Sequence, residues 1–140
     1  MTTTTTLAPS VGRRVWRPGL VAAGTAALAN LALFAASRAA GVSYLVRFSP
    51  DADPTRVTAA HVALTTLVPF VAGLAVAVVA ARHLRHGLRT VQVLGAALAV
   101  VSLAGPLSLE ADTAARLVLA AMHVVTGAAF AVALGRARAA

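Results

Sequence analysis

Polar side chains interrupt the four apolar runs of this chain, and one in each run forms a candidate polar layer: Asn30, Thr65, Ser102 and His123. Counting ~1.5 Å of rise per helical residue from the ends of the runs places all four at a similar depth. They could form a polar layer that binds a substrate or relays a proton, or they could form hydrogen bonds that fix the register of packed helices. Because a neutral histidine with a hydroxyl or amide partner costs little to bury, we favour the structural interpretation.

A second group of polar residues lies in the segments between the apolar runs. These residues form a candidate outer mouth above the bundle: Arg47, His61, Glu110, Asp112 and Arg116. Arg116 follows Asp112 by four residues, the favourable order for an ion pair on a helix. We expect Arg116 to project towards the opening between the helices, with Asp112 or Glu110 as its counter-ion. The alternative is mutual charge pairing at a wet surface, which contributes little.

Several chemistries are excluded by residue type. The chain has no cysteine, so thiolate metal sites and disulfides are absent, and none of its apolar runs contains the Asp or Glu that a proton-coupled exporter needs. His61 and His123 differ too much in depth to ligate one haem. His83 and His86 lack a third metal ligand. We therefore expect no catalytic residues, no cofactor and no metal site, and we predict that the protein is not an enzyme.

The elements that must position these residues are four apolar runs, each long enough to cross a ~30 Å hydrocarbon layer as a helix. The chain is 59% apolar, 11% charged and has a mean hydropathy of +0.85, too few polar side chains to cover a water-exposed surface. The predicted fold is an all-α integral membrane four-helix bundle. Its domain covers residues 20–135, between a disordered basic tail at 1–19 and a second tail at 136–140, with spans near 20–40, 57–81, 91–107 and 114–134.

The distribution of charge predicts the orientation of these spans. The segments at the two ends and between the second and third runs hold eight arginines and no acid. The other two connecting segments hold four arginines and all four acidic residues. Arginine-rich segments stay in the cytoplasm, so both termini are predicted to be cytoplasmic. Arg13-Arg14 with Ser37 and Ala39 would alternatively fit a cleaved signal peptide, but the first apolar run is longer than a signal h-region.

The positive charge has a membrane interpretation. The formal net charge is +8, and all 12 basic residues are arginine. The segment from Arg82 to Arg89 is predicted to be an inner loop attracted to anionic lipid headgroups rather than a nucleic-acid surface. The expected partners are therefore the bilayer, its anionic headgroups at the inner face and a second copy or another membrane protein, without nucleic acid.

Small and polar residues are expected on the inward face of each span, because lipid does not drive helices together through apolar burial. Steps of three and four residues predict four inward stripes: Ala23, Ala27, Asn30, Phe34 and Ser37; His61, Thr65, Pro69 and Ala72; Gly95, Ala99, Ser102 and Pro106; Arg116, Ala120, His123 and Gly127. Helix caps are predicted at Asp53 with Pro54, at Thr90 and at Asp112. The segment from Gly41 to Ser49 is expected to lie extended along the interface, with its aromatic side chains among the headgroups.

Short motifs give the chain a family resemblance. They are Val46-Arg47-Phe48, Gly105-Pro106-Leu107-Ser108, Arg116-Leu117 and Met122-His123-Val124-Val125. On these residues the chain resembles domain of unknown function 6069, a family of small actinobacterial membrane proteins. The resemblance implies a multi-pass protein of the bacterial plasma membrane and no mechanism. We expect a non-catalytic structural or accessory membrane component; the alternative is a small transporter or channel subunit that uses the polar layer and the outer mouth.

Overall fold

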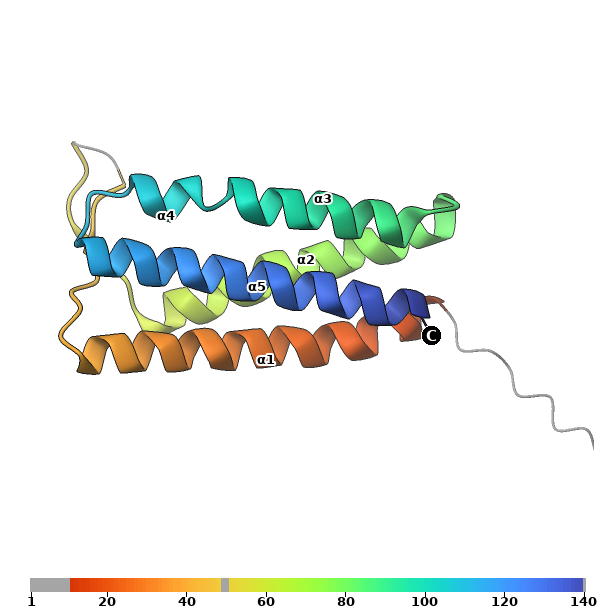
Figure 1. Ribbon diagram of the computed structural model, residues 1–140, viewed down its shortest axis with the longest axis horizontal. Coiled ribbons are helices and arrows are strands. Elements are labelled where there is room, and N and C mark those ends of the chain that lie inside the picture. The colour runs from red at the N-terminus through yellow and green to blue at the C-terminus, as the bar shows by residue number, and fades with distance from the viewer. Residues whose placement is uncertain (1–10, 49–50, 140) are drawn as a thin grey trace, which may run out of the picture.

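A computed structural model describes residues 11–48 and 51–139 of the chain. It contains helices α1 (Val11–Ala39), α2 (Ala59–His83), α3 (Gly87–Val101), α4 (Ala104–Ser108) and α5 (Thr113–Ala139), and the two-residue strands β1 (Leu45–Val46) and β2 (Thr55–Arg56) (Figure 1). Four helical segments are long and apolar enough to span a membrane, with α3 and α4 together forming the third, Gly87–Ser108. The predicted all-α, multi-pass four-helix bundle is therefore confirmed.

The helices run up and down, so Val11 and Ala139 lie at the same end of the bundle as the turn between α2 and α3 (Figure 1). We call this the basic end. The opposite end carries β1, β2 and the α4–α5 connection, and we call it the hairpin end. Helix α1 packs against both α2 and α5, whereas α3 and α4 pack on α5. Helix α2 crosses behind α5 from the α1 side at the hairpin end to the α3 side at the basic end (Figure 1).

Helix α1 begins at Val11, so residues 11–19 are helical and not part of a tail. The reason is packing: Val15 is 1% exposed and contacts the core, while Arg13 and Arg17 on the other faces of the same turns remain exposed. Long arginine side chains can extend from a helix to the headgroups while the helix itself continues. The disorder predicted for residues 1–10 concerns a segment outside the described residues.

Three predicted caps have different outcomes. Helix α2 is capped by Thr58, whose hydroxyl accepts from the His61 backbone N–H, and not by Asp53, which precedes β2. Thr90 lies inside α3, where its hydroxyl donates to the His86 carbonyl. Asp112 does cap its helix, because its Oδ1 accepts from the Ala114 N–H at 3.3 Å. The capping box at Thr58 and His61 satisfies donors that a more distant Asp53 would leave free.

The third span is broken between α3 and α4. Pro106 has no N–H to donate to the carbonyl of Ser102, four residues earlier. The N–H of Gly105 donates to that carbonyl instead, at 3.2 Å, which tightens the turn at the break.

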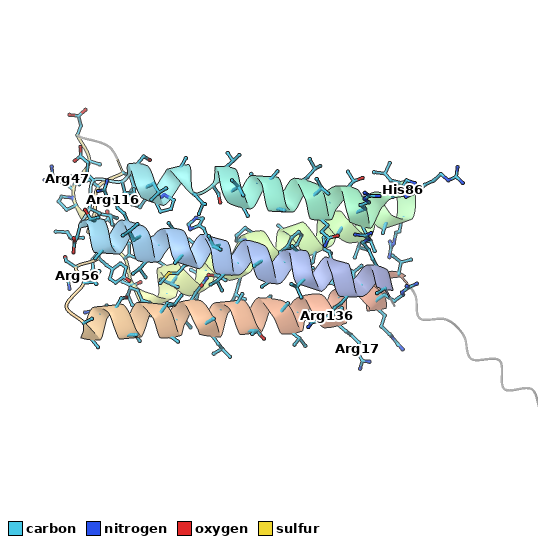
Figure 2. The ribbon with its side chains drawn as sticks, viewed as in Figure 1. Arg17, Arg47, Arg56, His86, Arg116 and Arg136 are labelled. Carbon is cyan, nitrogen blue, oxygen red and sulfur yellow. The ribbon has the colours of Figure 1, made fainter. Side chains whose placement is uncertain are left out.

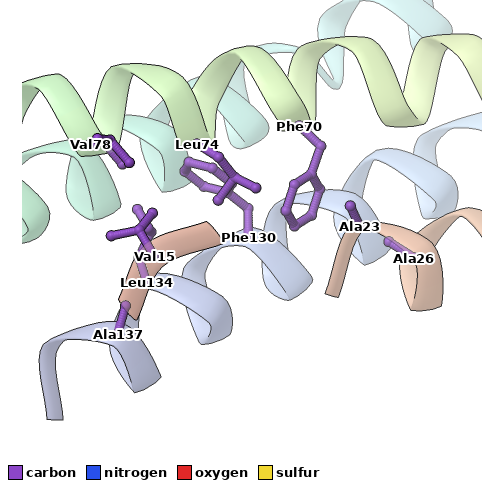
Figure 3. Packing of buried hydrophobic residues seen from close by; sticks show 10 residues of the cluster. Val15, Ala23, Ala26, Phe70, Leu74, Val78, Phe130, Leu134 and Ala137 are labelled. Carbon is purple, nitrogen blue, oxygen red and sulfur yellow. The ribbon is translucent and has the colours of Figure 1, made fainter. Parts of the chain in front are cut away.

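Two clusters of buried apolar residues hold the bundle together. The larger lies towards the basic end, where Leu74 and Leu134 are fully buried against Val15 and Phe70 meets Phe130 edge to face at 5.3 Å between ring centroids (Figure 3). The smaller lies towards the hairpin end and includes Phe34, Tyr44, Val62, Ala115 and Met122. The predicted stripe on α1 is confirmed, since its first four residues are buried and Ser37 is half-buried.

The stripe predicted on α2 is wrong by one position. All four residues of the predicted stripe are exposed: His61, Thr65, Pro69 and Ala72. The buried face of α2 instead carries Val62, Thr66, Phe70, Leu74 and Ala77. Large side chains can occupy this face because small residues on the neighbouring helices receive them. A Cβ at Gly19 of α1 would lie 2.5 Å from Leu74 of α2. Conversely, a Cβ at Gly73 of α2 would lie 2.9 Å from Phe130 of α5. Close approach thus depends on small residues opposite large ones.

The segment after α1 folds back over the hairpin end of the bundle. Gly41, at φ +87°, ends the helix, and Val46 pairs with Thr55 across the antiparallel strands. Tyr44 is 4% exposed: its ring stacks 4.7 Å from that of Phe34, and its hydroxyl bonds to Ser37. Tyr44 therefore lies in the core and not among the headgroups as expected, whereas Phe48 is exposed.

Candidate functional site: a cleft between α2 and α3–α4

A cleft of about 800 Å³ runs between α2 on one side and α3 and α4 on the other. Helix α5 and Asn30 of α1 close its back, and Val46, Phe48, Thr55 and Val57 cover its hairpin end. Helices α2 and α3 meet at their shared turn and diverge away from it (Figure 1). The volume falls in the upper part of the ~300–1,000 Å³ range of small-molecule sites.

The floor of the cleft is buried and its rims are exposed. Phe70, Met122 and Phe130 on the floor are each less than a tenth exposed. On the rims, Val76 of α2 is 57% exposed, and Leu94 and Leu98 of α3 are 62% and 68% exposed. Exposed rims on both helices mean that the cleft opens sideways between α2 and α3. When these helices span a bilayer, that opening faces the lipid.

Asn30 joins three helices at the back of the cleft. Its Nδ2 lies 3.0 Å from the Thr66 hydroxyl, 3.0 Å from the Thr126 hydroxyl and 3.3 Å from the Met122 carbonyl. Both hydroxyls donate to carbonyls of their own helices, at 2.8 Å to Val62 and at 2.8 Å to Met122, so towards Asn30 they can only accept. This chemistry fixes the orientation of the amide, with its NH₂ group towards the hydroxyls.

The oxygen of the same amide is left without a partner. Asn30 is 1% exposed and lines the cleft, yet its Oδ1 accepts no hydrogen bond from the described residues. A buried amide oxygen normally has a donor, because leaving it unpaired costs about 1–3 kcal/mol. Beside the cleft there is therefore a buried acceptor that the described residues do not satisfy.

Three further polar side chains of the walls, Thr65, Ser102 and His123, are also acceptors. Thr65 donates to the His61 carbonyl at 2.7 Å and Ser102 donates to the Ala99 carbonyl at 2.8 Å, so each hydroxyl keeps only lone pairs for the cleft. The Nδ1 of His123 lies 2.8 Å from the Leu119 carbonyl and must donate to it, which leaves Nε2 as an acceptor in the neutral ring. His61 is the exception, because its Nδ1 accepts from the Thr58 N–H at 3.3 Å and Nε2 of the neutral ring then carries the hydrogen. Thr65, Ser102 and His123 offer acceptors to the cleft.

The four residues of the predicted polar layer line one cleft but form no hydrogen bonds with one another. Thr65, Ser102, His123 and Asn30 all line the cleft, but Asn30 bonds to Thr66 and Thr126, and His123 bonds to its own helix. Sequence reasoning misses Thr126 altogether and selects Thr65 over Thr66. The sequence does contain a signal for Thr66 and Thr126: each follows a bulky residue, Val62 or Met122, by one helical turn and so shares a face with it. A prediction that places only small residues on the inward face does not select these two threonines.

Of the five residues of the predicted outer mouth, only His61 lines the cleft. Arg116 is half-buried and donates to the Leu107 carbonyl at 3.4 Å and to the Thr113 hydroxyl at 3.2 Å, and neither partner is the expected carboxylate. Arg47 joins the β-hairpin segment to the α4–α5 connection, because its N–H donates to the Glu110 carbonyl at 3.0 Å. Arg47, Arg56 and Arg116 gather at the hairpin end, whereas Arg17 and Arg136 lie at the basic end (Figure 2).

Within residues 11–48 and 51–139, no group of three or more His, Asp or Glu side chains is placed to hold a metal ion.

Comparison with known proteins identifies the family. Residues 10–140 match the family described as "Family of unknown function (DUF6069)", and the chain belongs to it. Neither the curated proteins nor the solved structures include a match to this chain.

Proposed function

We propose that this member of the DUF6069 family is a non-catalytic accessory component of the bacterial plasma membrane that holds a lipid-like amphiphile in the cleft between α2 and α3–α4. The observation that carries the proposal is the cleft itself: about 800 Å³ with a buried floor and an open side between two membrane-spanning helices. A molecule that enters through this side comes from the hydrocarbon layer, so it needs a large apolar part.

The polarity of the cleft changes along its length, as an amphiphile requires. Towards the basic end its lining is apolar, with Val76, Val91, Leu94 and Phe130 among the residues. The polar groups lie in the half nearer the hairpin end, where His61, Thr65 and Ser102 line the walls. A hydrocarbon chain is expected to lie along the apolar half, and its polar group is expected to face the hydroxyls and the imidazoles.

The acceptors of the polar half define the head of the ligand. Asn30 Oδ1, the Thr65 and Ser102 hydroxyl oxygens and His123 Nε2 offer lone pairs and no free hydrogens. A head with hydroxyl or amine hydrogens satisfies these groups, whereas an ester or ether head does not. We therefore propose an amphiphile with a donor-rich head, such as a hydroxylated one.

The same hydrogen bonds argue against catalysis. A nucleophilic hydroxyl needs a base that takes its proton, and the hydroxyls of Thr65, Ser102 and Thr126 donate instead to helix carbonyls. The acceptor His123 Nε2 belongs to a ring already tied to Leu119. Binding is the chemistry that these groups support.

Transport remains the second candidate, because polar side chains from all four spans surround the middle of the bundle. A transport path would also have to continue to the basic end. There Val15, Leu74, Val78 and Leu134 form a closed apolar cluster, which favours a binding cleft over a through path. Flux of a polar solute through the purified protein in vesicles would favour the transport interpretation.

The cleft can be filled without disturbing the core. A Cβ built at Gly105 meets no atom within 4 Å, and Gly105 lines the cleft; Gly24 of α1 has the same free space and does not line it. Gly105→Phe should therefore abolish retention of the amphiphile, and Gly24→Phe is the matched control. The measurement is mass spectrometry of the lipids that remain on the protein after purification in mild detergent.

The wild type and Gly24→Phe should retain the same donor-bearing amphiphile, and Gly105→Phe should lose it. Equal retention by all three proteins, with melting temperatures unchanged, would show that the cleft is not the binding site.

A further inference from the structure

A second cavity lies at the basic end, beyond the apolar end of the cleft. It has a volume of about 300 Å³ and four arginines in its lining, which come from three separate elements. Arg14 comes from the first turn of α1, Arg85 and Arg89 come from the turn between α2 and α3 and the start of α3, and Arg138 comes from the last turn of α5. No acidic side chain belongs to this end, because the four acids of the chain lie between residues 51 and 112 in the two connections of the hairpin end.

The fold holds the Arg138 side chain and the backbone turn that carries Arg85. Arg138 Nη1 donates to Gln92 Oε1 at 2.6 Å, and Gln92 Nε2 donates to the Ala131 carbonyl at 2.8 Å, so the guanidinium of α5 is tied to α3. The turn that carries Arg85 is tight. A Cβ at Gly87 would lie 2.1 Å from the backbone oxygen of Ala80, so only glycine permits this approach.

Arg14 supplies an independent sign of a ligand. Its Nε is buried and has no acceptor among the described residues. A buried guanidinium nitrogen without a partner is costly, and an anion is the usual partner of such a group. Four guanidinium groups that converge without an Asp or Glu side chain among the described residues make an anion still more favourable, because their mutual repulsion falls when negative charge enters.

We infer that this cavity binds the phosphate group of an anionic phospholipid. A planar guanidinium group can donate two parallel hydrogen bonds to a pair of phosphate oxygens. Arginines from three elements can do this from several sides of one phosphate. The cavity lies where helices leave the hydrocarbon layer, so headgroups are its natural neighbours, and basic pockets between membrane helices suit them. Leu84, more than half exposed beside the arginines, offers contact to the glycerol and upper chain of a lipid. A free phosphate would use the same guanidiniums but not this apolar contact.

The test compares two double variants of the full chain. Arg14→Gln with Arg138→Gln removes two charges from the cavity. Arg17→Gln with Arg136→Gln removes two charges from exposed residues of the same helices at the same end, outside the cavity lining (Figure 2). Native mass spectrometry in detergent then measures binding of phosphatidylglycerol, with phosphatidylcholine and inorganic phosphate as comparison ligands and thermal unfolding as a check of folding.

We expect the cavity variant to bind phosphatidylglycerol at least ~10-fold more weakly than the wild type, the loss expected for a charge-assisted hydrogen bond. The control variant should change by less than ~2-fold, as expected for screened surface charges. Arg14→Lys with Arg138→Lys should fall between them, because lysine keeps the charge and loses the fork.

Three outcomes would overturn the inference. Equal losses in the two double variants would mean that the attraction is diffuse and that no site exists. Phosphatidylcholine binding as tightly as phosphatidylglycerol would remove the anionic specificity. Inorganic phosphate that displaces the lipid at similar concentration would assign the cavity to a free anion. Phosphatidylglycerol also has the hydroxylated head proposed for the cleft, so each variant is measured again with Gly105→Phe added, which fills the cleft. A loss that depends on Arg14 and Arg138 in this background belongs to the cavity, and it is distinguishable from a failure of the proposed amphiphile site.

Discussion

Asn30 is the residue on which the polar chemistry of the bundle converges. Its NH₂ group joins α1 to Thr66 of α2 and Thr126 of α5. Its oxygen is a buried acceptor that has no donor among the described residues. One side chain therefore does two things. Its nitrogen fixes the register of three helices, and its oxygen provides a reason for a donor-bearing ligand in the cleft.

Two adjacent threonines allow a sharp test at this scale. Thr66→Val removes the hydroxyl that accepts from Asn30, so it should lower the free energy of unfolding by about 0.6–1.7 kcal/mol, the range for hydrogen bonds between membrane helices. Thr65→Val is the control, because the Thr65 hydroxyl bonds only within its own helix. Unfolding in a denaturing detergent measures both. A larger effect at Thr65 than at Thr66 would contradict the observed register of α2.

The sequence indicates Asn30, Ser102 and His123 as polar groups of the interior, because they interrupt apolar runs at similar depth. It does not indicate their partners. A hydroxyl in a helix can always bond to a carbonyl one turn earlier, as Ser102 and Thr65 do, so polarity alone does not show which hydroxyl meets another helix. That choice depends on the rotation of each helix, which changes by ~100° from Thr65 to Thr66.

At the scale of elements, the length of each apolar run predicts the four spans. The packed faces depend on large side chains of one helix that fit against small residues of the next. The stripe rule succeeds on α1 and α3, where alanine and glycine face their neighbours. It fails on α2, whose buried face carries Phe70 and Leu74. There the small residues lie on the opposing helices, for example Gly19 beneath Leu74. A pattern of small residues within one helix therefore cannot predict a contact that depends on the side-chain sizes of two helices.

Glycine at the turn between α2 and α3 gives a prediction for this scale. Gly87→Ala would place a Cβ against the Ala80 carbonyl at 2.1 Å, and backbone atoms cannot move aside cheaply, so we expect a loss of about 1–3 kcal/mol in the free energy of unfolding. Gly24→Ala is the matched control. Its Cβ meets nothing within 4 Å, and alanine is the better helix former, so stability should be unchanged or slightly higher. Equal melting temperatures for the two variants would contradict the tight turn.

The connecting segments show which helix starts can be predicted from local sequence. Asp112 caps α5 as its position predicts. Asp53 with Pro54 carries an equally good cap signal, yet α2 begins only after Thr58, because β2 first pairs with β1 over the end of the bundle. A strand pair of two residues has too little pattern to be read from the sequence. The tertiary contact of Tyr44 with Phe34 and Ser37 positions this segment.

For the whole molecule, the charge distribution predicts an orientation that the fold leaves open. The basic end carries eight arginines of the chain and no acidic side chain, so we expect it in the cytoplasm. Alkaline phosphatase fused after Ala140 should be inactive, and the enzyme inserted near Ala52, at the hairpin end, should be active. The reverse pattern would invert the bundle, and it would move the donor-bearing head of the amphiphile to the inner leaflet.

The polar half of the proposed amphiphile cleft and the proposed lipid cavity lie towards opposite ends of the bundle. The basic cavity would anchor the bundle to anionic headgroups on one side, while the cleft opens to the hydrocarbon layer and presents its acceptors towards the other. Neither site needs a water path through the bundle, whose basic end is packed by Val15, Leu74 and Leu134.

The most direct test of the amphiphile cleft is to map where such a molecule touches the protein. A hydroxylated amphiphile with a photoreactive group in its chain, added at low ratio to the purified protein, should crosslink to the cleft rims at Val76, Leu94 and Leu98. Leu28 and Leu117 are exposed to a similar degree outside the cleft, so they report ordinary contact with lipid. The account predicts that peptides of the rims carry most of the crosslinks and that Gly105→Phe removes them. Equal yields at Leu28, Leu117 and the rim positions, unchanged in Gly105→Phe, would contradict it.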